Sequence, residues 1–195
     1  HGCGIGVILD VVYNHLGSGS GFFREFSPHY FTDRYKNEWG AAINFDGPQS
    51  GPIREYFLSN AEYWIREYHF DGFRIDATQQ IFDTSEKNIV KEIVQKVRIQ
   101  AGEKQLFIIA ENECQDTALF HEYGIDAVWS DDFHRSATVA LTSHAEAYYS
   151  DYRASPQEFV STAKYGYLYQ GQYYTWQKKN RGTPALDLPS DYFIH

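Results

Sequence analysis

Apolar residues along the chain gather in short runs, and polar side chains follow each run directly. The first run, residues 4–12 (GIGVILDVV), is nearly continuous and rich in β-branched residues. Such a run is typical of a strand that is buried on both faces of a parallel sheet. Similar runs predict further strands at residues 70–76, 105–113 and 124–133.

Between the strands, apolar residues recur at helical spacing. The clearest case begins at Pro52, a tolerated first-turn position, after which Ile53, Phe57 and Ile65 fall on one face. The same spacing predicts helices over residues 52–68, 85–101, 117–123, 134–152 and 155–169. Residues 22–51 are aromatic, irregular and too long for an ordinary connection, so we expect them to cover a functional site.

The alternation of strands and helices predicts an α/β fold with a parallel sheet. A (β/α)8 barrel is favoured over a doubly wound sheet because no glycine-rich dinucleotide fingerprint follows any strand. A whole barrel needs about 250 residues, whereas this chain has 195 and enters a strand almost directly after His1. We therefore expect residues 1–195 to be an internal part of a single barrel domain.

Polar side chains gather at the predicted carboxyl ends of the strands, where barrel enzymes place their catalytic groups. Arg74 and Asp76 point to the same face because strand side chains alternate. The cation favours the ionised carboxylate, so Asp76 is either a nucleophile or one half of a structural ion pair. The strand ends supply these candidates: Asp10, Asn14 and His15; Arg74 and Asp76; Glu111 and Glu113; Asp131, Asp132 and His134.

Two of these carboxylates, Asp76 and Glu111, are sufficient to cleave a glycosidic bond. When two carboxyl groups lie about 5–5.5 Å apart, one attacks the anomeric carbon, the other protonates the leaving oxygen, and the configuration is retained. Glu111 follows the apolar run 106–110 and lies near a second acid, so we expect it to be held protonated as the general acid. Without such a partner, an exposed loop carboxylate is the commoner interpretation of a Glu at this place.

Composition narrows the range of partners. A formal net charge of −9 argues against nucleic acid, and an aromatic content of 17% suits a surface that faces sugars. Cys3 and Cys114 have no disulfide or zinc spacing, so we expect reduced thiols in a cytoplasmic setting, with no metal and no cofactor. No stretch approaches the roughly 20 apolar residues of a membrane span, so no membrane partner is expected.

Three motifs carry a resemblance to the α-amylase-type glycoside hydrolases. They are DVVYNH (Asp10 to His15), GFRIDA (Gly72 to Ala77) and IIAENE (Ile108 to Glu113), in the family's order and at suitable spacing. The segments WGAAINFDG, DATQQIFD, DAVWSDDFHRSATVAL and YYSDYRASPQEFV extend the resemblance over essentially the whole chain. They narrow it to a subgroup whose members cut the α-1,4 bond next to the trehalose unit of maltooligosyl trehalose. The resemblance implies a barrel of which strands 3 to 6 and the start of strand 7 are present, acting on maltooligosyl trehalose or a related α-glucan.

The resemblance also implies roles for individual residues. It makes Asp76 the nucleophile and Glu111 the acid/base, in agreement with the chemistry above, and places Arg74 and His15 around the cleaved bond. The neighbours of His15 in the first motif, Asp10 and Asn14, are expected to support the loop rather than to touch substrate. Contacts to substrate are further expected from Trp39, Glu113, Asp131, Asp132 and His134.

Two of these contacts have alternative explanations that the sequence leaves open. Trp39 suits either stacking on a sugar or anchoring a buried loop. His134 suits either a contact to substrate or the cap of the helix that follows.

The chain departs from the family pattern at its end. The family's third carboxylate lies in an Asn-His-Asp motif after the seventh strand, and this chain ends with DYFIH (Asp191 to His195), which we expect to lie inside that strand. The isolated chain is therefore expected to be inactive. Two other functions remain open: a glucan branching or debranching enzyme of the same family, and a noncatalytic carbohydrate-binding relative. Loss of catalysis usually shows as replacement of the nucleophile or the acid, whereas Asp76 and Glu111 are both present.

Overall fold

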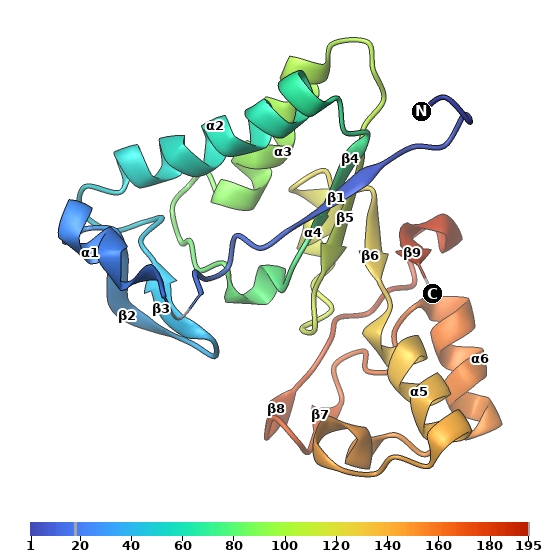
Figure 1. The fold of residues 1–195 in the computed structure, drawn as a ribbon. Coiled ribbons are helices and arrows are strands. Elements are labelled where there is room, and N and C mark those ends of the chain that lie inside the picture. The colour runs from blue at the N-terminus through green and yellow to red at the C-terminus, as the bar shows by residue number, and fades with distance from the viewer. Residues whose placement is uncertain (18, 195) are drawn as a thin grey trace.

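A five-stranded parallel sheet organises the computed structural model, which describes residues 1–17 and 19–194 (Figure 1). The strand order is β1-β4-β5-β6-β9, and every neighbouring pair is parallel. The parallel sheet predicted from the sequence is thus confirmed. The five strands are β1 (Ile8–Val11), β4 (Gly72–Ile75), β5 (Phe107–Glu111), β6 (Ala127–Trp129) and β9 (Phe193–Ile194).

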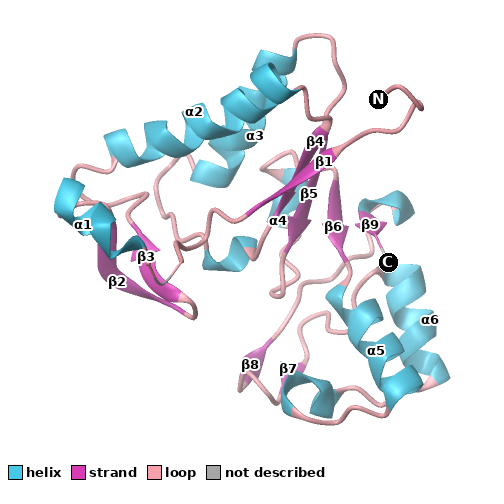
Figure 2. Ribbon diagram, in the orientation of Figure 1, coloured by secondary structure: helices cyan, strands magenta, loops and turns pink. Residues whose placement is uncertain are grey.

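Helices follow the strands, and α2 and α3 lie side by side against the sheet (Figure 2). Apolar side chains of both helices pack on the sheet face that carries Phe73, Ile75 and Ile108, and together they form the core. The α-helices are α1 (Phe23–Phe26), α2 (Gly51–Tyr68), α3 (Ile89–Ala101), α4 (Ala118–His121), α5 (Asp131–Thr142) and α6 (Pro156–Tyr165). Short 3-10 helices span η1 (Ser20–Phe22), η2 (Thr78–Gln80), η3 (Ala147–Asp151) and η4 (Ser190–Tyr192).

The opposite face of the sheet carries the polar residues. The strand register places Asp10 beside Arg74, Arg74 beside Ile109, and Glu111 beside Trp129 on this face. The prediction that residues 4–12 are buried on both faces is wrong, because Ile8 is 38% exposed and Val12 is 48% exposed. The physical reason is that β1 forms the edge of the described sheet and only its α2 side is covered.

Close contact between β4 and β5 requires a glycine. A Cβ added to Gly72 would lie 1.8 Å from the carbonyl oxygen of Phe107, far inside any allowed contact. The glycine therefore lets the two strands pair from their first residues onward, and this pairing sets the relative position of Asp76 and Glu111 at the other end.

Residues 22–51 are less irregular than the sequence suggested. They contain α1 and an antiparallel hairpin of β2 (Phe31–Asn37) and β3 (Gly40–Ile43), with a register shift between Thr32 and Lys36. The side chain of Asn37 donates to the carbonyl oxygen of Asn14 (2.7 Å), so the hairpin is fixed to the segment after β1. The segment therefore does lie over the carboxyl end of the sheet, as predicted.

Several helix boundaries differ from the predicted ones, and α5 begins at Asp131 instead of residue 134. Helix α3 begins at Ile89 instead of residue 85, because the Asp83 carboxylate binds the Ser85 and Ile89 backbone amides and winds the intervening residues into a loop. Helix α5 ends at Thr142, where Ser143 adopts φ +59°, so residues 134–152 do not form one helix. Helix α6 ends before Gly166, which adopts φ +71°.

The second hairpin and the last strand complete the described chain. The hairpin β7 (Tyr173–Tyr174) and β8 (Lys179–Asn180) follows α6. Strand β9 pairs with β6 where the sequence predicted the start of a further strand, and His195 lies outside the described residues. No helix within residues 1–17 and 19–194 is both long and apolar enough to cross a membrane.

Candidate active site

The carboxyl ends of the parallel strands meet at one edge of the sheet, between the β2–β3 and β7–β8 hairpins (Figure 1). Asn14 follows β1, Asp76 follows β4, Glu111 ends β5 and Asp131 begins α5 directly after β6. The sequence prediction that polar side chains gather at these strand ends is therefore confirmed by the strand directions.

The guanidinium group of Arg74 links the carboxylates. Its Nη1 donates to Oδ1 of Asp76 (2.6 Å) and to Oδ1 of Asp10 (2.9 Å), and its Nη2 lies 2.8 Å from Oε2 of Glu111. The guanidinium also lies over the Trp129 ring, 5.2 Å from its centroid. Because adjacent nitrogens of one planar group hold both Asp76 and Glu111, the two carboxyl groups lie close together at the strand ends.

Asn14 contacts the Asp76 carboxylate from the side of β1. The Asn14 side chain is only 1% exposed, and its Nδ2 donates to Oδ2 of Asp76 (3.0 Å). Its Oδ1 lies 2.8 Å from Nδ1 of His15, and the His15 ring lies 5.6 Å from the Trp39 ring. Asn14 was expected to support the loop; the structure gives it this role and a direct bond to Asp76 as well. Trp39 is 48% exposed, so it is not a buried anchor.

The residues after Asp76 bind β4 to β5. Ala77 adopts a left-handed conformation (φ +39°), which directs its backbone amide to Oε2 of Glu111 (3.1 Å). The Thr78 hydroxyl donates to the Glu111 carbonyl oxygen (2.8 Å) and accepts from the Asn112 side chain (2.9 Å). A non-glycine residue with positive φ is a strained feature that often occurs at functional sites, and here the strained backbone fixes the position of Glu111.

The environment of Glu111 favours its protonated form. Burial raises the pKa of Glu111 above its usual value, and the charges of Asp131 and Asp76 raise it further. Arg74 and the Ala77 amide act in the opposite direction without reversing the shift. A carboxyl group with a raised pKa beside a charged carboxylate is the arrangement that general acids use.

Arg135 lines the same pocket as Glu111. Its Nη1 binds Oε1 of Glu113 (3.0 Å), its Nη2 lies 3.7 Å from Oδ2 of Asp131, and its guanidinium lies 4.6 Å from the centroid of the Tyr148 ring. Burial raises the pKa of Asp131, and Arg135 opposes that change. Glu113 and Asp131, both predicted to contact substrate, thus lie in the pocket wall with a shared cation.

Asp132 lies away from this wall. Its side chain is fully buried, and its oxygens accept from the side chain of Gln115, the backbone amide of Leu168 (2.7 Å) and the hydroxyl of Tyr152 (2.5 Å). Arg181, itself only 2% exposed, places Nη2 3.2 Å from Oδ1 of Asp132. The structure therefore separates Asp132 from its neighbour Asp131, with which the sequence had grouped it, and surrounds it with protein donors.

His134 is exposed on the open face of the sheet. It lines a hollow of about 220 Å³ with Arg74, Glu111, Trp129 and Asp131. The cap of α5 is Ser130, whose hydroxyl accepts from the Phe133 amide, so His134 is not the helix cap.

A pocket of about 290 Å³ is lined by five of the predicted site residues. This volume is near the lower end of the roughly 300–1,000 Å³ that small-molecule sites occupy. Acidic groups at the strand ends and residues of the two hairpin turns line it. It is lined by Glu38, Trp39, Asp76, Ala77, Gln79, Glu111, Glu113, Asp131, Arg135, Tyr148, Trp176 and Gln177.

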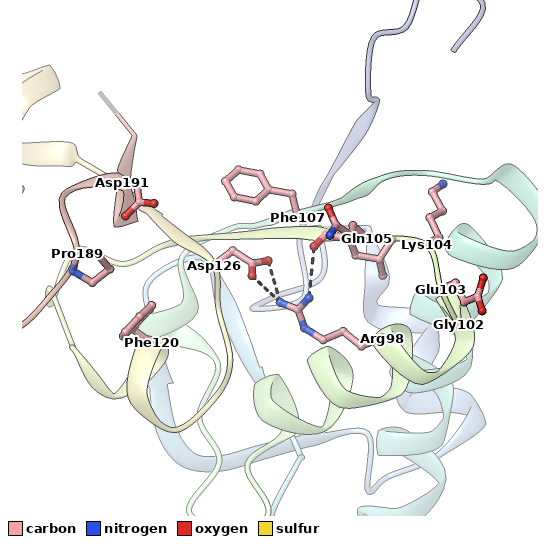
Figure 3. Close-up of a pocket in the computed structure, with 11 residues that line it drawn as sticks. Arg98, Gly102, Glu103, Lys104, Gln105, Phe107, Phe120, Asp126, Pro189 and Asp191 are labelled. Carbon is pink, nitrogen blue, oxygen red and sulfur yellow. Dashed lines mark hydrogen bonds and ion pairs between the residues drawn. The ribbon is translucent and has the colours of Figure 1, made fainter.

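A larger hollow of about 640 Å³ lies at the other end of the strands (Figure 3). Phe107, at the start of β5, and Asp126, just before β6, line it. Figure 3 shows Arg98 bonded to both carboxylate oxygens of Asp126, each at 2.8 Å. These charged groups neutralise each other, and the Asp126 carboxylate also accepts from the Ile108 amide (2.7 Å), so they support the strand starts.

Sequence reasoning missed several residues of the pocket wall. Arg135 could have been found by its position four residues after Asp131 on a helix face. Tyr148 lies in the segment YYSDYRASPQEFV, which carries part of the resemblance, whereas Trp176 lies in a segment without a clear motif. Only their aromatic character gave a signal for a place in the pocket wall. Within the described ranges, 1–17 and 19–194, no group of three His, Cys, Asp or Glu side chains is arranged to hold a metal ion.

Comparison with known sequences shows similarity along the whole chain. It is 36% identical over 197 residues to malto-oligosyltrehalose trehalohydrolase of Deinococcus radiodurans, a match that covers 100% of this chain and 32% of that protein. It is 38% identical over 199 residues to malto-oligosyltrehalose trehalohydrolase of Saccharolobus solfataricus, with coverage of 100% and 34%. The chain thus spans about a third of the length of these relatives. No family model matches the chain.

A shorter match and a solved structure agree with this result. A 1,4-alpha-glucan branching enzyme of Aliivibrio fischeri is 39% identical over 84 residues, which is 40% of this chain and 11% of that enzyme. The crystal structure of a putative alpha amylase from Salmonella typhimurium superposes with a TM-score of 0.89 at 29% identity, over 99% of this chain and 34% of that one. The resemblance stated from the motifs and the prediction of a partial barrel are both confirmed.

Proposed function

We propose that this chain carries the nucleophile and the acid/base of a retaining glycoside hydrolase. Its whole length matches about a third of the length of malto-oligosyltrehalose trehalohydrolases. Its reaction would be cleavage of the α-1,4-glucosidic bond next to the trehalose unit of maltooligosyl trehalose. The observation that carries the proposal is the single Arg74 guanidinium that binds both Asp76 and Glu111. Carboxyl groups held so close suit retention, which needs a separation of about 5–5.5 Å.

In the first step, an oxygen of Asp76 forms a bond to the anomeric carbon while the bond from that carbon to the leaving oxygen breaks. Glu111 gives its proton to the leaving oxygen, so trehalose departs as a neutral alcohol. In the second step, Glu111 takes a proton from water, whose oxygen attacks the anomeric carbon and releases Asp76. The raised pKa of Glu111 supports the first half of its role, and the bonds from Arg74 and Asn14 keep the Asp76 carboxylate oriented.

Residues around this pair are proposed to hold the sugar. Arg74 binds Asp76 directly, His15 lies beside Asn14, which also binds Asp76, and Trp39 offers an exposed aromatic face at the rim. Glu113, Asp131 and His134 supply polar groups on the Glu111 side. For Asp132 we propose a supporting role, since its donors are all protein groups.

The wider setting is also a proposal, since the chain spans only part of its relatives. We place residues 1–195 within one catalytic barrel domain that acts on maltooligosyl trehalose or a related α-glucan, without a cofactor and without nucleic acid or membrane as partner. Cys3 and Cys114 are free, which supports a reducing, cytoplasmic environment.

A branching or debranching enzyme is the second candidate, favoured by the match to a branching enzyme over 40% of the chain. Its likeness is confined to a smaller part of the chain than that of the trehalohydrolases, which match it from end to end. A noncatalytic sugar-binding relative is disfavoured because Asp76 and Glu111 are both present and joined by Arg74.

The deciding experiment uses the full-length enzyme with maltooligosyl trehalose and with amylose as substrates. We expect free trehalose from the first; new branch points with no trehalose would reject the proposal. Asp76→Asn should abolish turnover of every substrate because no nucleophile remains. Glu111→Gln should lose roughly 10²–10⁴-fold on the natural substrate but keep activity on a maltosyl fluoride, whose leaving group needs no proton. Equal losses on both substrates, with folding and sugar binding intact, would contradict the role of Glu111 and make Glu113 the next candidate.

A further inference from the structure

The turn that follows β4, residues 77–79, binds the end of β5, residues 111–113, beyond the point where the ladder between the two strands ends. The backbone amide of Ala77 donates to Oε2 of Glu111 (3.1 Å). At the centre of the turn, the Thr78 hydroxyl donates to the carbonyl oxygen of Glu111 (2.8 Å). One turn thus holds both the main chain and the carboxyl group of the proposed general acid.

The Thr78 hydroxyl is buried and acts as donor and acceptor at once. Thr78 is 6% exposed and Asn112 is 5% exposed. The side-chain Nδ2 of Asn112 donates to the hydroxyl (2.9 Å), while the hydroxyl donates to the Glu111 carbonyl oxygen. A hydroxyl joins a donor and an acceptor through one oxygen, which the similarly shaped side chain of valine cannot do. The hydroxyl, and not only the volume of the side chain, therefore ties the turn to the strand end.

Thr78 itself is not among the residues that line the candidate pocket, although its neighbours Ala77 and Gln79 are. It lines a separate hollow of about 270 Å³ together with Asn112 and Cys114. A substitution at Thr78 therefore removes no group from the lining of the candidate pocket. Its effect on turnover must pass through the groups that the hydroxyl holds.

The contacts of Glu111 also indicate which of its oxygens carries the proton. The Ala77 amide and the Arg74 guanidinium (Nη2, 2.8 Å) both lie at Oε2 of Glu111. An oxygen that faces two donors is an unfavourable place for a proton, so the proton of the general acid belongs on Oε1. A general acid must lie within hydrogen-bond reach of the oxygen that it protonates. The orientation of the Glu111 carboxyl group is therefore part of its function.

We propose that Thr78 is a positioning residue of the reaction. Its hydroxyl fixes the end of β5 against the turn, so that Oε2 of Glu111 stays at the Ala77 amide and Oε1 is presented to the leaving oxygen. A displacement of about 1 Å in an active site can cost about 10²-fold in rate, so a tie to the main chain of the general acid affects catalysis. The inference rests on the proposed function, in which Glu111 is that acid.

The test compares Thr78→Val with the wild-type full-length enzyme on maltooligosyl trehalose and on a maltooligosyl fluoride. Fluoride leaves without a proton, so only the first substrate depends on the orientation of Glu111. The kcat/KM for maltooligosyl trehalose should fall about tenfold or more, and that for the fluoride should change less than about threefold. The loss should lie in kcat, with KM for maltooligosyl trehalose within about twofold of wild type. Thr78→Ser keeps the hydroxyl and should restore most of the loss.

Thr162→Val is the matched control. Thr162 is also buried, and its hydroxyl also donates to a backbone carbonyl oxygen, that of Glu158 in α6 (2.9 Å). This variant should leave both substrates unchanged. Thr78→Ala serves where the valine variant does not fold, because the smaller side chain opens the hollow beside it to water that can bond the Glu111 carbonyl and the Asn112 amide. The same selective loss is expected from it.

Three results would overturn the proposal: equal loss on both substrates for a folded variant that lacks the Thr78 hydroxyl, no loss on maltooligosyl trehalose, or a serine variant that keeps the loss of the valine variant. The proposed function can fail separately. If the wild-type enzyme releases no trehalose but hydrolyses another maltooligosaccharide, the same comparison is made with that oligosaccharide and the fluoride. A selective loss there would keep the role of Thr78, and an equal loss on both would refute it.

Discussion

Removal of the buried guanidinium of Arg181 should strongly destabilise the structure that supports the candidate active site. Arg181 is 2% exposed and donates to the Glu113 carbonyl oxygen (2.7 Å) and the Tyr152 hydroxyl (2.8 Å). Its Nη2 lies 3.2 Å from Asp132, which is also fully buried. Arg181→Met fills most of the volume but leaves the Asp132 charge buried without a cation, and such a change costs about 3–5 kcal/mol.

The loss should be visible as a fall of the thermal unfolding midpoint of the full-length enzyme. At about 2–4 °C per kcal/mol for a cooperative unit of 150–250 residues, and less for a longer one, the expected fall is at most about 6–20 °C. Circular dichroism or calorimetry measures it. Lys178→Met, an exposed cation on the same hairpin, is the matched control and should shift the midpoint by less than about 2 °C.

A double variant tests whether Arg181 and Asp132 are energetically coupled. In Arg181→Met combined with Asp132→Asn, both charges are absent and the amide oxygen can still accept from Leu168. The double variant should therefore be more stable than Arg181→Met alone. If the two losses simply add, the guanidinium and the carboxylate are not energetically coupled, and the argument from a buried ion pair is refuted.

Two further predictions concern the charge of Glu111. Burial raises the pKa of Glu111 in the folded protein above the ordinary 4.5, so the protonated carboxyl group contributes its full stability below about pH 4.5, and this contribution falls as pH rises through the raised pKa. Glu111→Gln should therefore raise the thermal unfolding midpoint at pH 7 by up to a few degrees, at about 2–4 °C per kcal/mol. Melting curves at pH 4 should show no such gain. Because the Asp131 charge raises the pKa of Glu111, Asp131→Asn should move the basic limb of the kcat/KM pH profile to lower pH, and a shift to higher pH would contradict this electrostatic role.

The strand-end part of the site was predictable because it depends on local sequence. Side-chain alternation in β4 places Arg74 and Asp76 on one face, and parallel pairing brings the end of β5, with Glu111, beside them. Both features follow from the two-residue alternation of strand side chains and from the order of the strands alone. Asp131 and Asp132 show the limit of this reasoning. As consecutive residues at the start of α5 they point in different directions, one to the pocket and one to the core.

The remaining wall could not be predicted because its contacts join distant segments. Arg181 reaches Glu113 across 68 positions, and the amide of Trp176 reaches Asp151 across 25. Nothing in the local pattern around Arg181 distinguishes it from an exposed lysine or arginine of a hairpin, since its burial depends on Tyr169 and Tyr174 packing against the guanidinium. Likewise, the exposure of β1 depends on what covers the sheet face, which periodicity does not report.

The sheet and the two hairpins have different roles around Asp76 and Glu111. The sheet brings Asp76 and Glu111 together and keeps Glu111 in an unfavourable environment for its charge, while the strained Ala77 holds its carboxylate in place. A site of this kind lowers stability locally, so the surrounding structure must compensate. The buried contacts of Arg181 and the bond from Asn37 to Asn14 provide that support, one from each hairpin. The hairpins that carry Trp39 and Trp176 therefore also brace Asp76 and Glu111, so under the proposed function substrate binding and catalysis would depend on the same two supports.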